Sequence, residues 1–298
     1  MFEVGDSHHA PLYGKWMLVD GDILAYRCAF AAEKTRYLVQ DVGVFEAHKD
    51  IPKDTPKEVV WSQKEIQPVE FALQALKTTM EWLKETTRCS DLDIYLSGRR
   101  NFRYDVAVTK PYKGNRETVG KPTHYRACID YLKDNYGAIT TDGYEADDAL
   151  GIRSNELGED CFICTIDKDL DQLPGWKFGW VNDLVYRVSA REASFNLYRQ
   201  ILAGDHTDNV PGLDGIGLGR ASKLLEGCQS TTDLFERSWG AYRDRIQPVD
   251  RAWEYFLEQA RLVTIMTKEG QSLEDRIPQL RGAKPSNVDG SARDQVGV

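Results

Sequence analysis

The chain has 298 residues, of which 29% are charged and 41% hydrophobic, and its formal net charge is −9. This composition is ordinary for a globular protein, and the length allows one large or two moderate domains. The sequence has neither an apolar run of about 18 residues nor an N-terminal signal pattern, so we expect a soluble, cytoplasmic protein without a membrane partner. Its six cysteines show no disulfide-framework spacing, as is typical of a reducing compartment.

Apolar strands and amphipathic helices alternate through the first two thirds of the chain. In chain order we predict a flexible arm over 1–14, a strand over 15–19, a helix from about 23, a long loop or insertion over 41–68, a helix over 69–87, a strand over 92–96, a helix over 123–134, a short strand over 138–140, a helix over 146–155, a strand over 161–166, and short strands over 176–181 and 185–188. This alternation predicts an α/β fold with a mostly parallel sheet. The α/β core should span 15–193, a helical region 194–281, and a disordered tail 282–298.

Four acidic clusters follow or end apolar stretches of the sequence. They are Asp20 and Asp22; Glu145, Asp147 and Asp148; Asp167 and Asp169; and Asp205 and Asp208. Carboxylates at the carboxyl ends of parallel strands meet at one edge of a sheet, where they would repel each other unless cations lay between them. Mg²⁺ prefers carboxylate oxygen and keeps waters for substrate phosphates. The clusters therefore indicate a two-metal phosphoryl-transfer site.

Each cluster also has an ordinary structural explanation. Asp20 and Asp22 precede an apolar helix and could be N-caps, an alternative that weighs equally with metal binding for Asp22. The cluster at 145–148 could be the acidic first turn of a helix, favoured by the helix dipole. Asp167 and Asp169 could belong to a strand-to-helix turn. Any one cluster alone is explained in this way, whereas the four together favour metal.

Two further segments indicate contact with phosphates, despite the acidic net charge. The segment from Arg99 to Arg126 has eight basic residues, Lys113 and Arg116 among them, against two acidic ones, and Tyr112 lies within it. An aromatic beside Lys and Arg suits base stacking and phosphate binding, although most charge runs are solvated loops. The run Gly215-Ile216-Gly217-Leu218-Gly219-Arg220 with Lys223 predicts a helix-hairpin-helix over 212–225, whose glycines allow positive φ and whose amides can hold a phosphate. The alternative is an αα-hairpin without a ligand.

In this order, the motifs resemble those of the flap endonuclease and 5′→3′ exonuclease family. The resemblance is closest to phage-encoded 5′→3′ exonucleases and to the 5′-nuclease domain of bacterial DNA polymerase I, and it covers about residues 15–265. It implies a PIN-like nuclease core with a helical arch over 99–126, a C-terminal helix-three-turn-helix, and two Mg²⁺ or Mn²⁺ ions, with K⁺ at the glycine-rich turn.

The resemblance also implies roles for particular residues. Asp20, Glu145 and Asp147, with Asp148 adjoining, would hold one metal, and Asp167, Asp169, Asp205 and Asp208 would hold or frame the second. Lys113 would contact the scissile phosphate, Tyr112 would stack, and Arg116 would clamp a phosphate, while Gly215, Gly217, Gly219, Arg220 and Lys223 would bind duplex DNA. The family usually has an aspartate where this chain has Ser97, which puts the geometry of the first metal in question.

We therefore expect a metal-dependent 5′ nuclease that hydrolyses phosphodiester bonds near the 5′ ends of duplex, flapped or RNA-primed DNA. Its task would be primer removal or recombination during phage replication, in the host cytoplasm, and RNA–DNA hybrids and RNase H activity are further expectations. Asp20, Asp147, Asp167 and Lys113 are the expected catalytic residues. Two alternatives are a PIN-type ribonuclease acting on single-stranded RNA, and a non-catalytic DNA-binding protein, which Ser97 favours.

Overall fold

The structure, a computed structural model, describes residues 7–116 and 120–283. Its central feature is a six-stranded sheet in the order β6-β5-β1-β7-β8-β9, in which only β9 runs antiparallel to its neighbour. The strands are β1 (Trp16–Asp20), β5 (Asp91–Leu96), β6 (Ile139–Thr140), β7 (Cys161–Cys164), β8 (Gly175–Gly179) and β9 (Leu184–Val188). The predicted α/β class with a mostly parallel sheet is confirmed.

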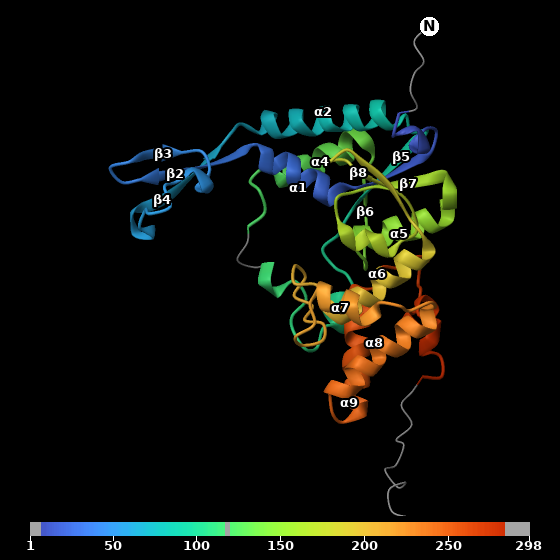
Figure 1. The fold of residues 1–298 in the computed structure, drawn as a ribbon. Helices are drawn as coiled ribbons and strands as arrows, with labels where there is room; N and C mark the ends of the chain where they lie inside the picture. Colours follow the sequence, from blue (N-terminus) through green and yellow to red (C-terminus); the bar gives the residue numbers. More distant parts are fainter. Residues whose placement is uncertain (1–6, 117–119, 284–298) are drawn as a thin grey trace, which may run out of the picture.

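Helices cover both faces of this sheet (Figure 1). The helices of this part are α1 (Gly21–Ala31), α2 (Val69–Thr87), α3 (Arg103–Val106), α4 (Tyr125–Tyr136) and α5 (Ala146–Leu157). One core joins the sheet to α1, α2 and α4 through buried side chains such as Leu24, Leu76 and Leu132. A smaller core on the other side packs Leu150 of α5 against Leu18 and Ile163 of the sheet. Burying these apolar side chains contributes roughly 1.5–3 kcal/mol each.

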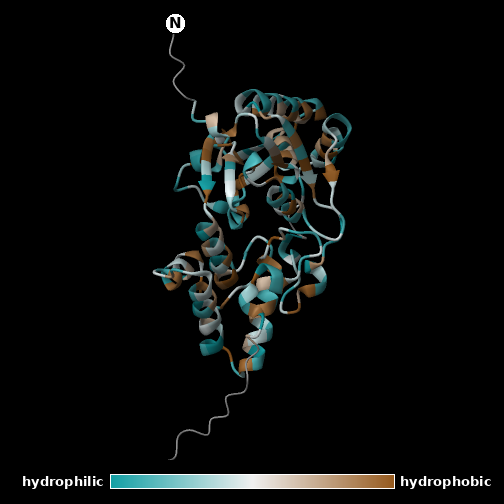
Figure 2. Ribbon diagram, turned by 90° about the vertical axis from the view of Figure 1, so that its right-hand side faces the viewer, coloured by the Kyte–Doolittle hydropathy of each residue, from teal (hydrophilic) through white to brown (hydrophobic). Residues whose placement is uncertain are grey.

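The C-terminal helices form a second layer at one end of the sheet (Figure 1). They are α6 (Ala190–Ala203), α7 (Leu218–Leu225), α8 (Thr231–Arg245), α9 (Val249–Val263) and α10 (Leu273–Arg276). They enclose a core of their own around Tyr242 and Phe256. Figure 2 shows hydrophobic residues on the central strands and mixed faces on these helices, as expected for helices that bury one side only. No helix in the described ranges is long and apolar enough to cross a bilayer.

Two segments differ from the sequence predictions. Where a loop or insertion was expected over 41–68, β3 (Gly43–Phe45) and β4 (Val60–Ile66) join the preceding β2 (Glu33–Val39) in a three-stranded antiparallel sheet that projects from the body. Within the expected arm 1–14, a 3-10 helix (Ala10–Leu12) places Leu12 fully inside the core, so residues 7–14 pack against the body. Residues 1–6, and the expected tail beyond 283, lie outside the described residues.

Candidate metal-dependent phosphate site

The acidic clusters lie where β1, β7 and α5 meet. β1 and β7 are adjacent parallel strands, so Asp20, which ends β1, lies beside the turn that follows β7 and carries Asp167. The hydroxyl of buried Thr165 donates to Asp20 Oδ2 at 2.9 Å and accepts from the Asp167 amide at 3.0 Å. Thr165 therefore holds two candidate ligands together, and the sequence analysis missed this role because a threonine inside an apolar strand carries no chemical signal of its own.

A small cavity of about 30 Å³ collects the other carboxylates. Its lining includes Glu145, Asp147, Asp169, Asp205 and Asp208, which come from α5, from the turn after β7, and from the loop after α6. Five carboxylates around a space of this size, which could hold an ion or a water, match the sequence expectation of convergence. The same cavity touches Tyr112 and Arg103, so the basic segment also reaches it.

Burial and mutual repulsion raise the pKa values of several of these carboxyl groups. Desolvation is the largest cause for each, followed by neighbouring negative charges. The pKa of Asp20 is raised to about 7, with Asp22 and Asp167 contributing, and that of Asp169 to about 8, with Asp167 and Asp205 contributing. The pKa values of Asp147, Asp167 and Asp205 are also raised, for the same two reasons. Such a cluster is stabilised either by protons or by a cation.

The basic segment lies directly against the acidic loop. Lys113 Nζ pairs with Glu145 and lies 3.5 Å from Asp208 Oδ2, and Arg116 pairs with the other oxygen of Asp208. Asn115 donates to the carbonyl of His206 at 2.7 Å, and the Lys113 amide donates to the Asp208 carbonyl at 2.9 Å. Lys113 has a φ of 56°, a left-handed conformation that such a close contact between loops can impose. The positively charged side chains of Lys113 and Arg116 therefore neutralise part of the negative charge of the carboxylate cluster.

Not every predicted ligand is available to a metal. Asp148 is fully buried, and its oxygens accept from both terminal nitrogens of Arg103, at 2.6 and 2.9 Å, and from the Glu145 and Met266 amides. Arg103 also donates to the carbonyls of Leu262 and Thr264. We therefore place Asp148 outside the candidate metal set, as an anchor between α5 and the C-terminal helices.

Tyr112 does not lie where a base-stacking residue would. Only 5% of its surface is exposed, and its hydroxyl oxygen lies 2.8 Å from Glu145 Oε2 and 2.6 Å from Asp208 Oδ2, so its single proton is shared between the two carboxylates. Its ring packs edge-on against Tyr104. In this conformation Tyr112 orients two carboxylates. In residues 99–116 and 120–126 the regular structure is limited to α3, a 3-10 turn (Gly114–Arg116) and the start of α4, so the implied helical arch is not formed there.

The capping explanations and the convergence both hold. Asp20 caps α1 by accepting from the Ile23 amide, and Asp167 accepts from the Asp169 amide. Glu145 and Asp148 form a reciprocal capping box at the start of α5. Capping engages one oxygen of Asp20 and one of Asp167, while both side chains still lie in the carboxylate cluster. The two explanations that the sequence set against each other are therefore compatible.

Ser97 lies at the position after β5 where the resemblance implies an aspartate. Its hydroxyl accepts from the Ala146 amide at 3.0 Å, and its amide donates to Asp22 Oδ2 at 2.8 Å. The other oxygen of Asp22 accepts from the Tyr125 hydroxyl. Ser97 thus fixes the start of α5, and Asp22 brings a carboxylate to the end of β5, where Ser97 has none.

The glycine-rich turn lies at the surface of the C-terminal layer. Gly215 has a φ of 71° and Gly212 a φ of 64°, as predicted for a tight turn, but Gly217 has a φ of −89° and begins α7 as its N-cap. Buried Ile216 and Ala221 anchor the turn. The residues predicted to bind DNA are exposed on its outer side: Gly215, Gly217, Gly219, Arg220 and Lys223. Arg220 donates to the Gly215 carbonyl at 2.6 Å, which stiffens the turn.

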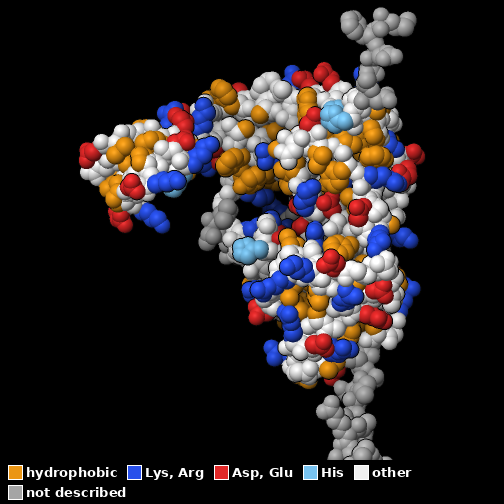
Figure 3. Space-filling view, in the orientation of Figure 1, with side chains coloured by type: hydrophobic (Ala, Val, Ile, Leu, Met, Phe, Trp, Pro, Cys, Tyr) orange, Lys and Arg blue, Asp and Glu red, His pale blue; other side chains and the backbone are white. Residues whose placement is uncertain are grey.

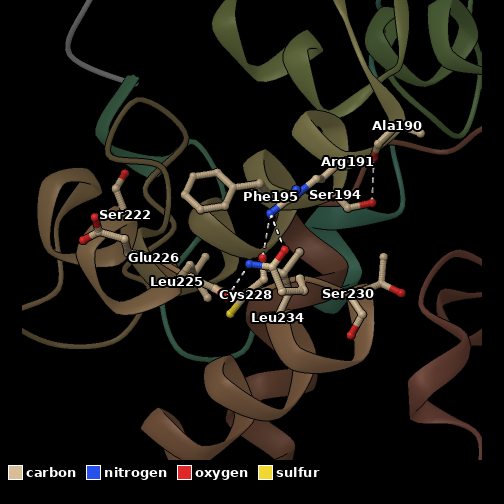
Figure 4. A pocket seen from close by; sticks show the side chains of 13 residues that line it. Ala190, Arg191, Ser194, Phe195, Ser222, Leu225, Glu226, Cys228, Ser230 and Leu234 are labelled. Carbon is tan, nitrogen blue, oxygen red and sulfur yellow. Dashed lines mark hydrogen bonds between the residues drawn. The ribbon is translucent and has the colours of Figure 1, made fainter.

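Two surface features lie near this turn. Figure 3 shows a hollow between the main body, the projecting three-stranded sheet and the C-terminal helices, with Lys and Arg side chains at its rim. A larger cavity of about 490 Å³ lies between α6, α7 and α8 and includes none of the carboxylate clusters (Figure 4). Arg191 crosses it to donate to the Cys228 carbonyl at 3.1 Å.

Comparison with known proteins shows which of them this chain resembles in sequence. No protein-family model matches the chain. It is 30% identical over 241 residues to DNA polymerase I of Bacillus subtilis (strain 168), covering 74% of this chain and 24% of that protein. It is 26% identical over 289 residues to the thermostable DNA polymerase I of Thermus caldophilus, covering 91% of this chain and 31% of that protein. The chain thus spans less than a third of the length of these relatives.

The fold of this chain is similar to that of a solved structure. The T5 D15 protein co-crystallised with metal ions superposes with a TM-score of 0.51 and 17% identity, over 83% of this chain and 88% of that chain. At this identity the likeness concerns the fold. The comparisons confirm the resemblance that the ordered motifs predict: the chain is similar in sequence to part of DNA polymerase I and has the fold of the T5 D15 protein.

Proposed function

We propose that this chain is a divalent-metal-dependent 5′ nuclease that hydrolyses phosphodiester bonds near 5′ ends of duplex, flapped or RNA-primed DNA. The observation that carries the proposal is the cavity lined by five carboxylates, with a lysine and an arginine against it. The T5 D15 protein is named a flap endonuclease, crystallised with DNA and metal ions, in another of its structures. Primer removal or recombination, in a phage-infected cell, is the task that fits this activity.

The donor set fits hard divalent cations. It consists of carboxylates from β1, α5, the turn after β7 and the loop after α6, and burial first and neighbouring carboxylates second raise the pKa values of Asp20, Asp147 and Asp169. Carboxylate oxygen is the ligand that Mg²⁺ and Mn²⁺ prefer. Asp20, Glu145 and Asp147 would hold one ion and Asp167, Asp169, Asp205 and Asp208 the second. Bound there, two such ions would supply a hydroxide nucleophile and charge stabilisation at phosphorus.

The side chains of the basic segment would bind the phosphate. Lys113 pairs with Glu145 and Arg116 with Asp208, and both of these carboxylates line the cavity, so a scissile phosphate bound there would lie close to the two basic side chains. A lysine there can stabilise the negative charge that develops on the phosphoryl oxygens. Hydrogen bonding to Tyr112 orients Glu145 and Asp208, and hydrogen bonding to Thr165 orients Asp20 and Asp167.

The glycine-rich turn would hold the duplex. Gly215, Gly217 and Gly219 expose backbone at the start of α7, with Arg220 and Lys223 beside it. Backbone amides and a helix N-terminus bind phosphates without reading bases, which suits an enzyme that recognises structure rather than sequence. A K⁺ ion at this turn is part of the proposal.

A cleavage assay tests the proposal against its alternatives. Labelled 5′-flapped DNA, blunt duplex, an RNA–DNA hybrid and single-stranded RNA are incubated with the protein, with and without Mg²⁺ or Mn²⁺. We expect metal-dependent products from the 5′ end of the flap and the duplex, and none from the Asp167→Ala variant. Cleavage of single-stranded RNA alone would indicate a ribonuclease instead. Tight flap binding without cleavage under any metal would indicate a non-catalytic DNA-binding protein.

A further inference from the structure

Two adjacent histidines and an aspartate meet on the side of the sheet formed by β8 and β9. His9 Nε2 lies 2.6 Å from Asp183 Oδ1, and His8 Nε2 lies 3.3 Å from Asp183 Oδ2. The Asp183 carbonyl oxygen is also 3.1 Å from His8 Nε2. Within the residues that the structure describes, this is the one set of three His, Cys, Asp or Glu side chains whose ligand atoms all lie within 4.8 Å of one another.

Several contacts hold this cluster in its orientation. The ring of His9 packs edge-on against Phe178 of β8, with the ring centroids 5.5 Å apart. Its Nδ1 lies 3.1 Å from the hydroxyl of Ser7. A ring N–H that donates to such an oxygen leaves the lone pair of Nε2 free, which is how metal-binding histidines are usually oriented. Asp183 has a φ of 52° in the turn between β8 and β9, which directs its side chain toward the histidines.

The spacing of the donor atoms suits a tetrahedral ion. Zn²⁺ binds imidazole nitrogen and carboxylate oxygen at about 2.0–2.1 Å, so two ligands of one tetrahedral ion lie roughly 3.3 Å apart. His8 Nε2 and Asp183 Oδ2 are separated by that value, 3.3 Å, whereas His9 Nε2 and Asp183 Oδ1, at 2.6 Å, are at hydrogen-bonding distance and would move apart when an ion enters between them. The His8 and Asp183 side chains are 57% and 48% exposed, so an ion can enter from solvent and keep a water as its fourth ligand. Mg²⁺ is a poor match, because it favours an all-oxygen octahedron.

We propose that His8, His9 and Asp183 form a binding site for Zn²⁺ or a similar first-row transition-metal ion that fastens the N-terminal segment to the β8–β9 turn. Residues 7–14 are otherwise held to the body by buried Leu12, by the contact of His9 with Phe178, by Arg88 over the Tyr13 ring and by a hydrogen bond from the Gly14 amide. An ion bound by one segment and one distant turn would crosslink them, as a structural zinc does. This site shares no residue with the carboxylate clusters, so it stands whether or not the chain is a nuclease.

The competing explanation is an ion pair between protonated histidine and Asp183 without any metal. Zinc titration by calorimetry distinguishes the two, with excess Mg²⁺ present to compete for the proposed carboxylate site. We expect one zinc equivalent to bind the wild type with a micromolar or lower Kd, and the affinity to fall at least tenfold in His8→Gln, His9→Gln and Asp183→Asn. The affinity should also fall at low pH, because protons compete for the imidazole nitrogens.

Controls locate the ion. His48→Gln, a histidine on the projecting sheet, and Asp167→Ala, in the carboxylate cluster, should both retain the zinc equivalent. His8 is more than half exposed, so His8→Gln should keep the fold by circular dichroism even if His9→Gln does not. Zinc should raise the melting temperature of wild type and of His48→Gln but not of His8→Gln. Equal zinc binding in wild type and His8→Gln, or its loss in Asp167→Ala, would overturn the proposal.

Discussion

Two neighbouring aspartates of α5 should respond in opposite ways to replacement by alanine. Asp148 is fully buried, and its four hydrogen-bond donors include both terminal nitrogens of Arg103, which is itself 3% exposed. Asp147, one residue earlier, lines the cavity, and burial and four neighbouring carboxylates raise its pKa. The positive charge of Arg103 therefore compensates the Asp148 carboxylate, whereas neighbouring carboxylates repel that of Asp147.

Asp148→Ala should destabilise the protein strongly. Removing one partner of a buried ion pair leaves the other charge without compensation and costs about 3–5 kcal/mol. The Glu145 and Met266 amides lose an acceptor as well. For a chain of this size we expect the melting temperature to fall by roughly 5–10 °C. Asp147→Ala should leave the stability of the metal-free protein unchanged or raise it by about 1 kcal/mol, because repulsion is relieved.

Thermal unfolding followed by circular dichroism, with EDTA and then with saturating Mg²⁺, measures both variants. Cleavage of a flapped substrate at a temperature where both are folded completes the test. Asp147→Ala should be inactive, and Mg²⁺ should stabilise it less than wild type. Asp148→Ala should keep measurable cleavage when folded. A stable Asp148→Ala variant that has lost its response to Mg²⁺ would refute the division between anchor and ligand.

Three other predictions follow from the same geometry. Lys113→Ala should lower the single-turnover rate by about 10²–10³-fold with little change in substrate affinity. A rate equal to that of wild type, with weaker binding, would show that Lys113 only attracts the DNA backbone. Because folding raises the pKa of Asp20 to about 7 and of Asp169 to about 8, the metal-free protein binds more protons when folded, so its stability should fall as pH rises from 5 to 8. Saturating Mg²⁺ should remove most of that fall, and a flat profile in EDTA would contradict it. Gly212→Ala should destabilise the fold, because an added Cβ would lie 2.3 Å from the Gly204 amide nitrogen and the residue has a φ of 64°. Gly217→Ala is the matched control and should fold normally, because an added Cβ there would meet no atom within 4 Å. Equal melting temperatures of the two variants would contradict this prediction and show that the backbone at Gly212 can relax.

The sequence allowed the sheet and the gathering of carboxylates to be predicted, because both depend on local patterns. Apolar runs that end in aspartate, such as the one ending at Asp20, indicate buried strands whose last residue turns into a cleft. The three-stranded sheet over 33–66 could not be read in this way. Its strands are largely exposed and polar, so no hydrophobic alternation marks them, and only long-range pairing such as Arg36 with Gln63 defines them.

The partners of individual carboxylates were also beyond the sequence. Asp147 and Asp148 are adjacent and chemically identical, and only the helix geometry directs one into the cavity and the other to Arg103. Arg103 comes from a basic segment for which the sequence analysis considered phosphate binding or a solvated loop, and not a buried ion pair. The burial of Tyr112 could not be predicted for a similar reason. A tyrosine beside Lys113 and Arg116 suits stacking on a base and hydrogen bonding to a carboxylate equally well.

Backbone contacts close the base of the loop that carries Asp205 and Asp208. The Asp205 amide donates to the Val210 carbonyl at 2.9 Å, the Val210 amide returns a hydrogen bond at 2.7 Å, and Gly204 and Gly212 approach so closely that neither could carry a side chain. Fixing the backbone of a residue costs about 1–2 kcal/mol of conformational entropy. Here that cost is met when the chain folds, before any ion arrives. The loop should therefore bind a cation with little further loss of entropy, and its amides at 205 and 210 should exchange hydrogen slowly in the metal-free protein.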